Sequence, residues 1–217
     1  MYVAIEGVIG VGKTTLARLL QKACDAEILL EVFEENPFLS DFYSDRERYA
    51  FQTQIFFLLS RYHQQRRTVH DLLETGRHLF ADYTFAKDAL FARINLKGDE
   101  LDMYYKVHEA LAEKIQKPDL LVYLQASTDT LMQRIALRDR PYERQMERAY
   151  IHELNKAYED FFSKPFDHTP VLTIDTNHLD IIRNPEHLKW MENRIRQSLN
   201  LPPFQQSLPL PDVPSGA

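Results

Sequence analysis

Residues 7–14 read GVIGVGKT, and this stretch decides the fold class of the 217-residue chain. It matches G-x-x-x-x-G-K-[ST], the phosphate-binding loop, whose backbone N–H groups surround phosphate oxygens. The apolar run YVAIE precedes it at residues 2–6, and residues 14–23 (TTLARLLQKA) follow with the apolar spacing of a helix. Strand, glycine turn and helix N-terminus form the setting that the motif requires. The stretch therefore predicts a nucleoside triphosphate site.

The residue types inside the loop predict how it holds the phosphates. Its glycines permit tight turns, Lys13 offers a positive charge to the terminal phosphates, and the Thr14 hydroxyl is placed to ligate Mg²⁺. ATP and Mg²⁺ are therefore the expected cofactors. The expected ATP contacts of the loop are Gly7, Val8, Ile9, Gly10, Val11, Gly12, Lys13, Thr14 and Thr15.

Composition narrows the class of protein. The chain is 44% hydrophobic and 27% charged, which suits one α/β domain, and its net charge of −6 argues against a nucleic-acid partner. The single cysteine, Cys24, excludes an intramolecular disulfide and fits a reducing compartment. The first expected strand begins at residue 2 and no apolar run approaches membrane-spanning length. We therefore expect a cytoplasmic protein with no targeting peptide and no membrane partner.

Apolar runs alternate with helix-like stretches along the chain. Strands are expected at residues 2–6, 28–32, 78–82, 120–124 and 171–174, and helices at 13–25, 46–74, 85–95, 100–117, 128–138, 144–162 and 178–198. This order predicts an α/β fold with a parallel five-stranded sheet flanked by helices. Residues 1–200 are expected to form one domain, and the Pro-rich residues 201–217 a mobile tail. His108 lies on an apolar stripe of the helix at 100–117 and is expected to pack there rather than ligate.

Two carboxylates follow strands at the edge where ligands of α/β sheets collect. Glu31 ends the second expected strand and could accept a proton from a hydroxyl nucleophile, with Glu34 and Glu35 as alternatives; the other interpretation is a solvated acidic turn. Asp82 ends the third strand, where an acid ligates Mg²⁺ directly or through water or else caps the next helix.

Five arginines lie close together in residues 134–148. The sequence contains no guanine-reading Asn-Lys-x-Asp motif and no Asp-x-x-Gly switch, so a GTPase is not expected. The segment could form a mobile lid that neutralises a transferring phosphoryl group, or its cations could complement a helix C-terminus. Phosphoryl transfer to a small molecule is the expected chemistry. The arginines are Arg134, Arg138, Arg140, Arg144 and Arg148.

Five ordered motifs resemble the deoxynucleoside kinases, specifically the bacterial purine-deoxynucleoside branch. They are GVIGVGKTT from Gly7, EENPFLSDFY from Glu34, FQTQIFFLLSR from Phe51, ADYTFAKDALFA from Ala81 and RIALRDRPYE from Arg134. The resemblance implies a P-loop kinase fold with an arginine-bearing lid. It also implies ATP-dependent phosphorylation of the 5′-hydroxyl of a purine deoxynucleoside in nucleotide salvage, with deoxyguanosine favoured, deoxyadenosine next, and a homodimer.

The resemblance also implies roles for single residues. Glu31 would be the general base, Tyr43 and Glu143 would hold the 3′-hydroxyl, and Gln54 would read the base together with an Arg61–Asp88 pair. Mg²⁺ would be held by Thr14 and Asp82, and Asp175 and Thr176 would lie near the loop covering the donor's base. The expected catalytic residues are Glu31, Asp82, Lys13, Arg138 and Arg140, and the expected ATP contacts outside the loop are Arg134 and Arg138.

The chain departs from the family pattern in two places. Val32 follows Glu31 where the family commonly has proline, and Tyr83 follows Asp82 where the family commonly has arginine. The second departure leaves open how Glu31 is oriented and how phosphoryl charge is offset, with Arg138 and Lys87 as candidates. Two alternative functions stay open: a nucleoside monophosphate kinase, and a non-catalytic nucleotide sensor.

Overall fold

The computed structural model describes residues 1–164, 166 and 169–202, which contain a five-stranded parallel sheet in the order β2-β3-β1-β4-β5. The strands are β1 (Tyr2–Glu6), β2 (Glu27–Leu29), β3 (Leu79–Ala81), β4 (Leu120–Gln125) and β5 (Val171–Asp175). The predicted parallel sheet flanked by helices is therefore confirmed. Strand β2 ends earlier than expected because the chain leaves the ladder there: the Glu31 N–H donates to the Asp82 side chain at 2.8 Å instead of to a strand.

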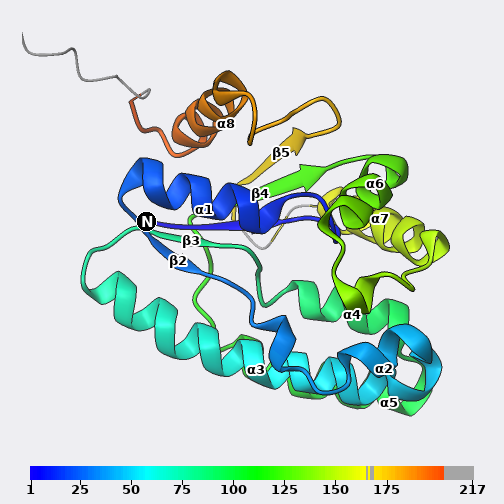
Figure 1. Ribbon diagram of the computed structural model, residues 1–217. Coiled ribbons are helices and arrows are strands. Elements are labelled where there is room, and N and C mark those ends of the chain that lie inside the picture. Colours follow the sequence, from blue (N-terminus) through cyan, green and yellow to red (C-terminus); the bar gives the residue numbers. More distant parts are fainter. Residues whose placement is uncertain (165, 167–168, 203–217) are drawn as a thin grey trace, which may run out of the picture.

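Helices surround the sheet, with α1 and α3 on opposite sides of strands β1, β2 and β3 (Figure 1). The helices are α1 (Lys13–Cys24), α2 (Leu39–Ser44), α3 (Arg46–Glu74), α4 (Lys87–Asn95), α5 (Gly98–Ala112), α6 (Thr128–Arg138), α7 (Arg148–Phe162) and α8 (Pro185–Ser198). Two 3₁₀ turns, η1 (Phe33–Glu35) and η2 (Pro141–Glu143), complete the described elements. The predicted bounds of α3 and α6 are confirmed, whereas α2, η1 and η2 were not expected.

Three helices begin or end at least four residues inside the predicted bounds, whereas α1 and α4 are shorter by only one and two residues. Helix α5 ends at Ala112 rather than 117, where the chain turns ahead of Pro118, a residue that disfavours helix before it. Helix α7 begins at Arg148 because residues 144–145 continue the turn that η2 opens and Glu147, just before the helix, has an extended backbone. Helix α8 begins at Pro185, whose position favours the first helical turn, and the Asn184 side chain caps it by accepting the Glu186 N–H at 3.1 Å.

The central strands form the buried core that positions the site. Strand β1 pairs in parallel with both β3 and β4, and all of its residues are buried. Because parallel strands end at one edge, the loop after β1 and Asp82 after β3 emerge side by side. The His108 ring stacks on Phe85 with centroids 4.9 Å apart, so its predicted packing role is confirmed.

Two further expectations concern membranes and the tail. Within the described residues, no helix is both long and apolar enough to cross a membrane. The expected tail falls almost entirely on residues 203–217, which lie outside the described part of the chain.

Candidate active site

The phosphate-binding loop leads from β1 directly into α1, as the motif predicts. At Gly10 φ is +87°, and a Cβ there would lie 2.8 Å from Ile135 Cγ1 and 3.0 Å from the Leu131 carbonyl oxygen. Glycine is therefore required both for the backbone conformation and for the close approach of α6. The Lys13 ammonium donates to the carbonyls of Gly7 at 2.7 Å and Val8 at 3.3 Å, which holds it inside the curve of the loop.

The surroundings of Lys13 disfavour the charged form of its side chain. Burial, followed by the nearby positive charge of Lys87, lowers the pKa of Lys13 to about 8, although the carboxylates of Glu6, Glu31 and Asp82 act in the opposite direction. Bound phosphate oxygens would stabilise the ammonium form, since opposite charges favour ionisation. The loop thus presents a poorly solvated cation to an incoming polyanion.

Asp82 joins the loop to the acceptor side of the site. Its Oδ2 accepts the Thr14 hydroxyl at 2.5 Å, and its Oδ1 accepts the Glu31 N–H at 2.8 Å. Its side chain does not cap α4, whose first turn has no side-chain cap, so the capping interpretation is wrong. Hydroxyl and carboxylate oxygens are ligands that Mg²⁺ accepts, usually one or two of them together with phosphate oxygens and water. Thr14 and Asp82 therefore fit the expected metal.

Glu31 lies between two cations that come from different helices. Its Oε1 accepts the Arg61 Nε at 2.9 Å, and its Oε2 accepts the Lys87 Nζ at 2.6 Å. Burial acts to raise the pKa of Glu31, but these charges and their hydrogen bonds outweigh it and hold the pKa well below its ordinary value. The carboxylate is ionised at neutral pH and can accept a proton. Of the alternatives, Glu35 is exposed and the Glu34 side chain lies outside the described part.

The long helix α3 and the start of α4 bring the expected base-reading residues together. Arg61 pairs with Asp88 as well as with Glu31, and the side chains of both Arg61 and Asp88 are buried. Gln54 lies two turns before Arg61 on α3 and is 3% exposed. The expected Arg61–Asp88 pair is confirmed, and the Gln54 side chain carries both donor and acceptor groups.

The segment after α6 packs against α2. The buried Glu143 carboxylate accepts Arg138 Nη2 at 2.6 Å and lies 3.6 Å from Arg140 Nη1. The Tyr142 ring stacks on Tyr43 with centroids 6.3 Å apart. Burial and then the neighbouring Tyr150 and Glu143 raise the pKa of the Tyr43 phenol well above its ordinary value, so it stays a hydrogen-bond donor. Movement of this segment as a lid stays a prediction.

The other arginines of the segment, Arg134, Arg144 and Arg148, have different partners. Arg134 donates to the Val11 carbonyl at 3.2 Å and the Thr176 carbonyl at 2.6 Å, so it ties α6 to the phosphate-binding loop and to the chain after β5. Arg144 and Arg148 form exposed pairs with Asp139 and Asp129, both at 2.7 Å. These last two arginines therefore belong to the surface.

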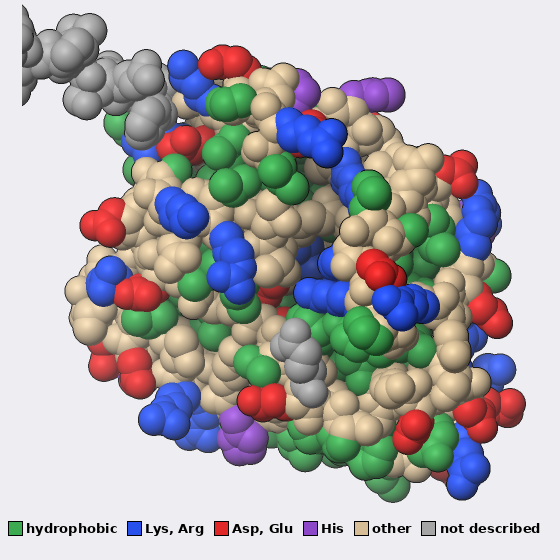
Figure 2. All heavy atoms as spheres, in the orientation of Figure 1, with side chains coloured by type: hydrophobic (Ala, Val, Ile, Leu, Met, Phe, Trp, Pro, Cys, Tyr) green, Lys and Arg blue, Asp and Glu red, His purple; other side chains and the backbone are tan. Residues whose placement is uncertain are grey.

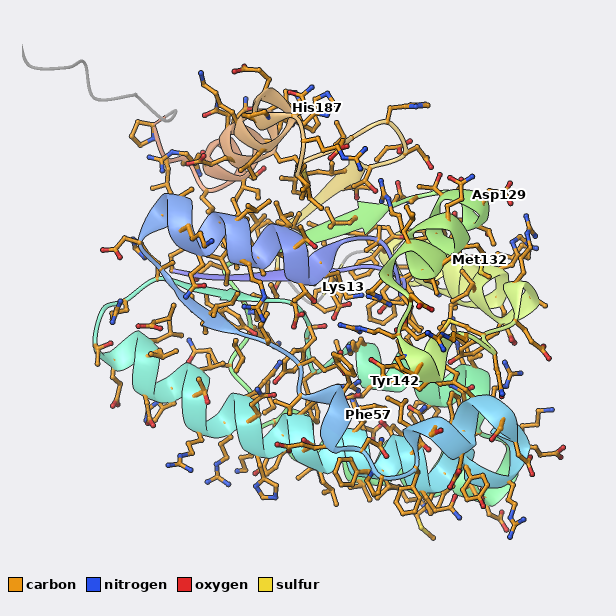
Figure 3. The ribbon with its side chains drawn as sticks, in the orientation of Figure 1. Lys13, Phe57, Asp129, Met132, Tyr142 and His187 are labelled. Atoms are coloured by element: carbon orange, nitrogen blue, oxygen red, sulfur yellow. The ribbon has the colours of Figure 1, made fainter. Side chains whose placement is uncertain are left out.

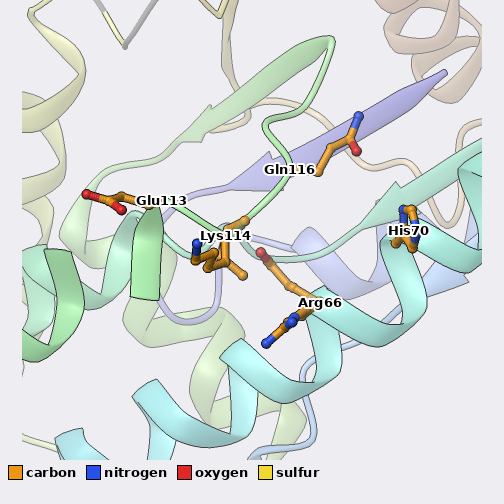
Figure 4. Close-up of a pocket in the computed structure, with 7 residues that line it drawn as sticks. Arg66, His70, Glu113, Lys114 and Gln116 are labelled. Atoms are coloured by element: carbon orange, nitrogen blue, oxygen red, sulfur yellow. The ribbon is translucent and has the colours of Figure 1, made fainter. Parts of the chain in front are cut away.

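Lys and Arg side chains border a hollow near the centre of the face shown in Figure 2. Lys13 and Tyr142 lie near the middle of the same view, whereas Asp129 and His187 lie at its periphery (Figure 3). A separate cavity of about 420 Å³ opens between α3 and the segment before β4 (Figure 4), at the opposite edge of the sheet from the loop. It is lined by Gln65, Arg66, His70, Glu113, Lys114, Ile115 and Gln116.

Sequence reasoning missed one buried carboxylate that organises the site. Glu6, at the end of β1, is 0% exposed. Its carboxylate accepts the Thr84 N–H at 2.6 Å and the Tyr158 hydroxyl at 3.1 Å, which ties α7 and the chain after β3 to the start of the loop. A charged residue closing the apolar run YVAIE is the signal that could have marked it, because buried charges require partners.

Comparison with known proteins decides the family, because residues 3–200 match the sequence model of the deoxynucleoside kinases. The chain belongs to the deoxynucleoside kinase family. It is 34% identical to the deoxyguanosine kinase of Bacillus subtilis, over 90% of this chain and 96% of that one. It is 32% identical to the deoxyadenosine kinase of Dictyostelium discoideum, over 94% and 84% of the two chains.

Solved structures agree with this assignment. The deoxyadenosine kinase of M. mycoides, solved with dCMP and dCDP, superimposes with a TM-score of 0.79 at 26% identity, covering 91% of this chain and 99% of that one. The same enzyme with bound dATP also gives a TM-score of 0.79. This chain is therefore a kinase that acts on deoxynucleosides, as the ordered motifs indicated. The assignment favours neither the monophosphate kinase nor the non-catalytic sensor.

Proposed function

We propose that this kinase transfers the γ-phosphoryl group of ATP to the 5′-hydroxyl of a purine deoxynucleoside in nucleotide salvage, with deoxyguanosine preferred and deoxyadenosine next. The observation that carries the proposal is the placement of Glu31. Its carboxylate is ionised and held by α3 and α4, and its N–H is bonded at 2.8 Å to Asp82, the residue that also binds Thr14 of the loop. Through its bond to Asp82, Glu31 thus connects the acceptor side of the site with the donor side.

The acceptor binds on the side of α3 and α4. Gln54 and the Arg61–Asp88 pair present donors and acceptors to a purine edge, while the Tyr43 phenol and Glu143 hold the 3′-hydroxyl. These contacts direct the 5′-hydroxyl toward Glu31, which accepts its proton as the oxygen attacks phosphorus. Each carboxylate oxygen can accept more than one hydrogen bond, so Arg61 and Lys87 leave room for the hydroxyl.

The donor binds at the loop. The N–H groups of residues 7–15 and the Lys13 ammonium surround its phosphates, and Arg138 and Arg140 offset the charge that spreads over the transferring group. Thr14 and Asp82 would hold Mg²⁺, which when bound neutralises phosphate charge. The γ-phosphorus–oxygen bond to ADP breaks, the new bond to the 5′-oxygen forms, and the products are the deoxynucleoside 5′-monophosphate and ADP.

The preference for deoxyguanosine rests on the sequence around the site. The Asp-Tyr pair at residues 82–83 and the motif RDRPYE at 138–143 are features in which the chain resembles bacterial deoxyguanosine kinases. A deoxyadenosine/deoxycytidine kinase of Bacillus subtilis is also 30% identical to this chain, so the base has to be measured.

ADP release from ATP and Mg²⁺ tests the proposal, with each of the four deoxynucleosides and their 5′-monophosphates as separate acceptors. Turnover with deoxyguanosine, and more slowly with deoxyadenosine, is the expected result. Turnover only with monophosphates would replace the proposal by a nucleotide kinase. ATP binding without acceptor-dependent ADP release would replace it by a sensor.

We also propose, from the family likeness alone, that the kinase acts as a homodimer in the cytoplasm. Light scattering after size-exclusion chromatography should give twice the chain mass of 25.6 kDa. A single-chain mass at assay concentration would contradict the dimer.

A further inference from the structure

The residue after Asp82 brings no charge to the site. Tyr83 stands where the family commonly has arginine, and it is 0% exposed. Its hydroxyl donates to Gln64 Oε1 at 2.6 Å, and Gln64 Nε2 donates to the Leu30 carbonyl at 2.7 Å. Tyr83 therefore anchors the backbone next to Glu31, while the positive charge that an arginine would supply has to come from another residue.

Lys87, the first residue of α4, supplies a positive charge at this point. Its side chain is 5% exposed, and its Nζ lies 2.6 Å from Glu31 Oε2. The same ammonium lies 5.5 Å from the centroid of the Tyr83 ring and 6.0 Å from that of Phe91. A lysine buried in this way is unfavourable unless it is paired, and the carboxylate and the ring faces offset the cost. The tyrosine thus forms part of the lysine's environment.

The charges around Glu31 balance only when Lys87 is counted. Arg61 contacts two carboxylates at once, those of Glu31 and Asp88. Lys87 adds the second cation, so that two carboxylates face two cations in a region almost closed to water. Without Lys87, one guanidinium would have to serve both acids, and Glu31 Oε2 would lose its donor.

Two cations on different oxygens also fix the orientation of the Glu31 carboxylate. Arg61 of α3 holds Oε1, Lys87 of α4 holds Oε2, and the backbone N–H of the same residue is bonded to Asp82. Arg138, the other candidate to replace the missing arginine, pairs with Glu143 at 2.6 Å and is not one of the cations that hold the Glu31 carboxylate. The restraint that Tyr83 does not provide therefore comes from α4.

We propose that Lys87 is a positioning residue for phosphoryl transfer, which aims the Glu31 carboxylate at the acceptor hydroxyl and takes over the charge of the family arginine absent at position 83. The inference rests on the proposed function, in which Glu31 accepts the proton. Lys87 acts through Glu31 and not by contact with the reacting atoms.

Steady-state kinetics of three variants test this role. In Lys87→Met, kcat should fall about tenfold to a hundredfold, the loss expected for one charge-assisted hydrogen bond, with little change in the KM for ATP. Lys87→Arg should recover most of kcat because it keeps a cation at the same place. Lys156→Met, an exposed lysine on α7, is the matched control and should behave like the wild type.

The pH dependence of kcat separates this role from a structural one. Glu31 is faced by Arg61 from α3, Lys87 from α4, Lys13 from the loop and Asp82 after β3, with Asp88 beside Arg61. Removal of one of these cations favours protonated Glu31, so the acid limb of kcat should move to higher pH in Lys87→Met and return in Lys87→Arg. A variant that merely misfolds in part would lose amplitude without moving the limb.

Two results would overturn the role of Lys87 alone: an active wild type whose Lys87→Met variant keeps its kcat, or a folded Lys87→Arg variant as slow as Lys87→Met. Circular dichroism and the melting temperature establish folding in each case. A wild type that releases no ADP with any acceptor would instead overturn the proposed function, and this role with it.

Discussion

Glu31 is the residue that we propose as the proton acceptor, and its backbone N–H bond to Asp82 connects it to the phosphate-binding loop. In Glu31→Gln we expect kcat to fall by about 10²–10⁴, the range for loss of a general base, while deoxynucleoside affinity changes little. The amide keeps the size and can still accept a hydrogen bond from Arg61. Initial-rate kinetics and calorimetric titration with deoxyguanosine measure the two quantities. A near-normal kcat would move the proton-accepting role to Asp82 or water.

Lys13 should couple ATP binding to proton uptake. Its pKa of about 8 in the free protein means that a large fraction is neutral at pH 8.5, and phosphate oxygens favour the charged form. Binding at that pH should therefore take up protons, and affinity should fall as the pH rises from 8 toward the ordinary lysine pKa near 10.4. Calorimetry in two buffers of different ionisation enthalpy measures the uptake. Heats that do not depend on the buffer would contradict this, and Lys22→Met, an exposed lysine, should retain the coupling.

The two helices whose bounds were predicted correctly, α3 and α6, both carry local end signals, although similar signals at the start of α8 were missed. Asp45 caps α3 by accepting the Arg48 N–H, Ser127 caps α6, and Asp139 ends α6 with φ at 47°. The partners of Glu31 could not be found in that way, because they lie 30 and 56 residues away along the chain. Their meeting depends on the packing of α3 and α4. The family resemblance supplied the Arg61–Asp88 pair. The missing family arginine made Lys87 a candidate beside Arg138, but the sequence did not show which of the two contacts Glu31.

The packing of the phosphate-binding loop against α6 makes Gly10 irreplaceable. Gly10→Ala should destabilise the protein for two reasons. The positive φ should cost about 1–2 kcal/mol, and the overlap of the new Cβ with Ile135 and Leu131 should cost about 1–3 kcal/mol more. Gly76→Ala is the control, because Gly76 has φ of +74° and no atom within 4 Å of its added Cβ. Denaturant unfolding without ligand compares the two variants. Equal losses would contradict the close packing of loop and helix.

For the whole molecule, the ion cluster around Glu31 should make global stability depend on pH. The pKa of Glu31 is lowered on folding, so its contribution is present above the ordinary glutamate pKa near 4.3 and is lost as the pH falls toward the folded value. Glu31→Gln leaves Lys87 buried without its carboxylate, which should cost about 3 kcal/mol at pH 7. Protonation removes the same charge from the wild type, so the difference should shrink steadily below pH 4.

Urea unfolding of the wild type and Glu31→Gln between pH 3 and pH 7 measures this difference directly, with Glu35→Gln as the control. Glu35 is exposed, so its variant should follow the wild type throughout. A difference for Glu31→Gln that stays constant with pH would mean that packing, and not the charge of the carboxylate, is what the glutamine disturbs. In that case Arg61 and Lys87 would not require an ionised Glu31. The charge of Glu31 would then not be what connects α3 and α4 to the phosphate-binding loop.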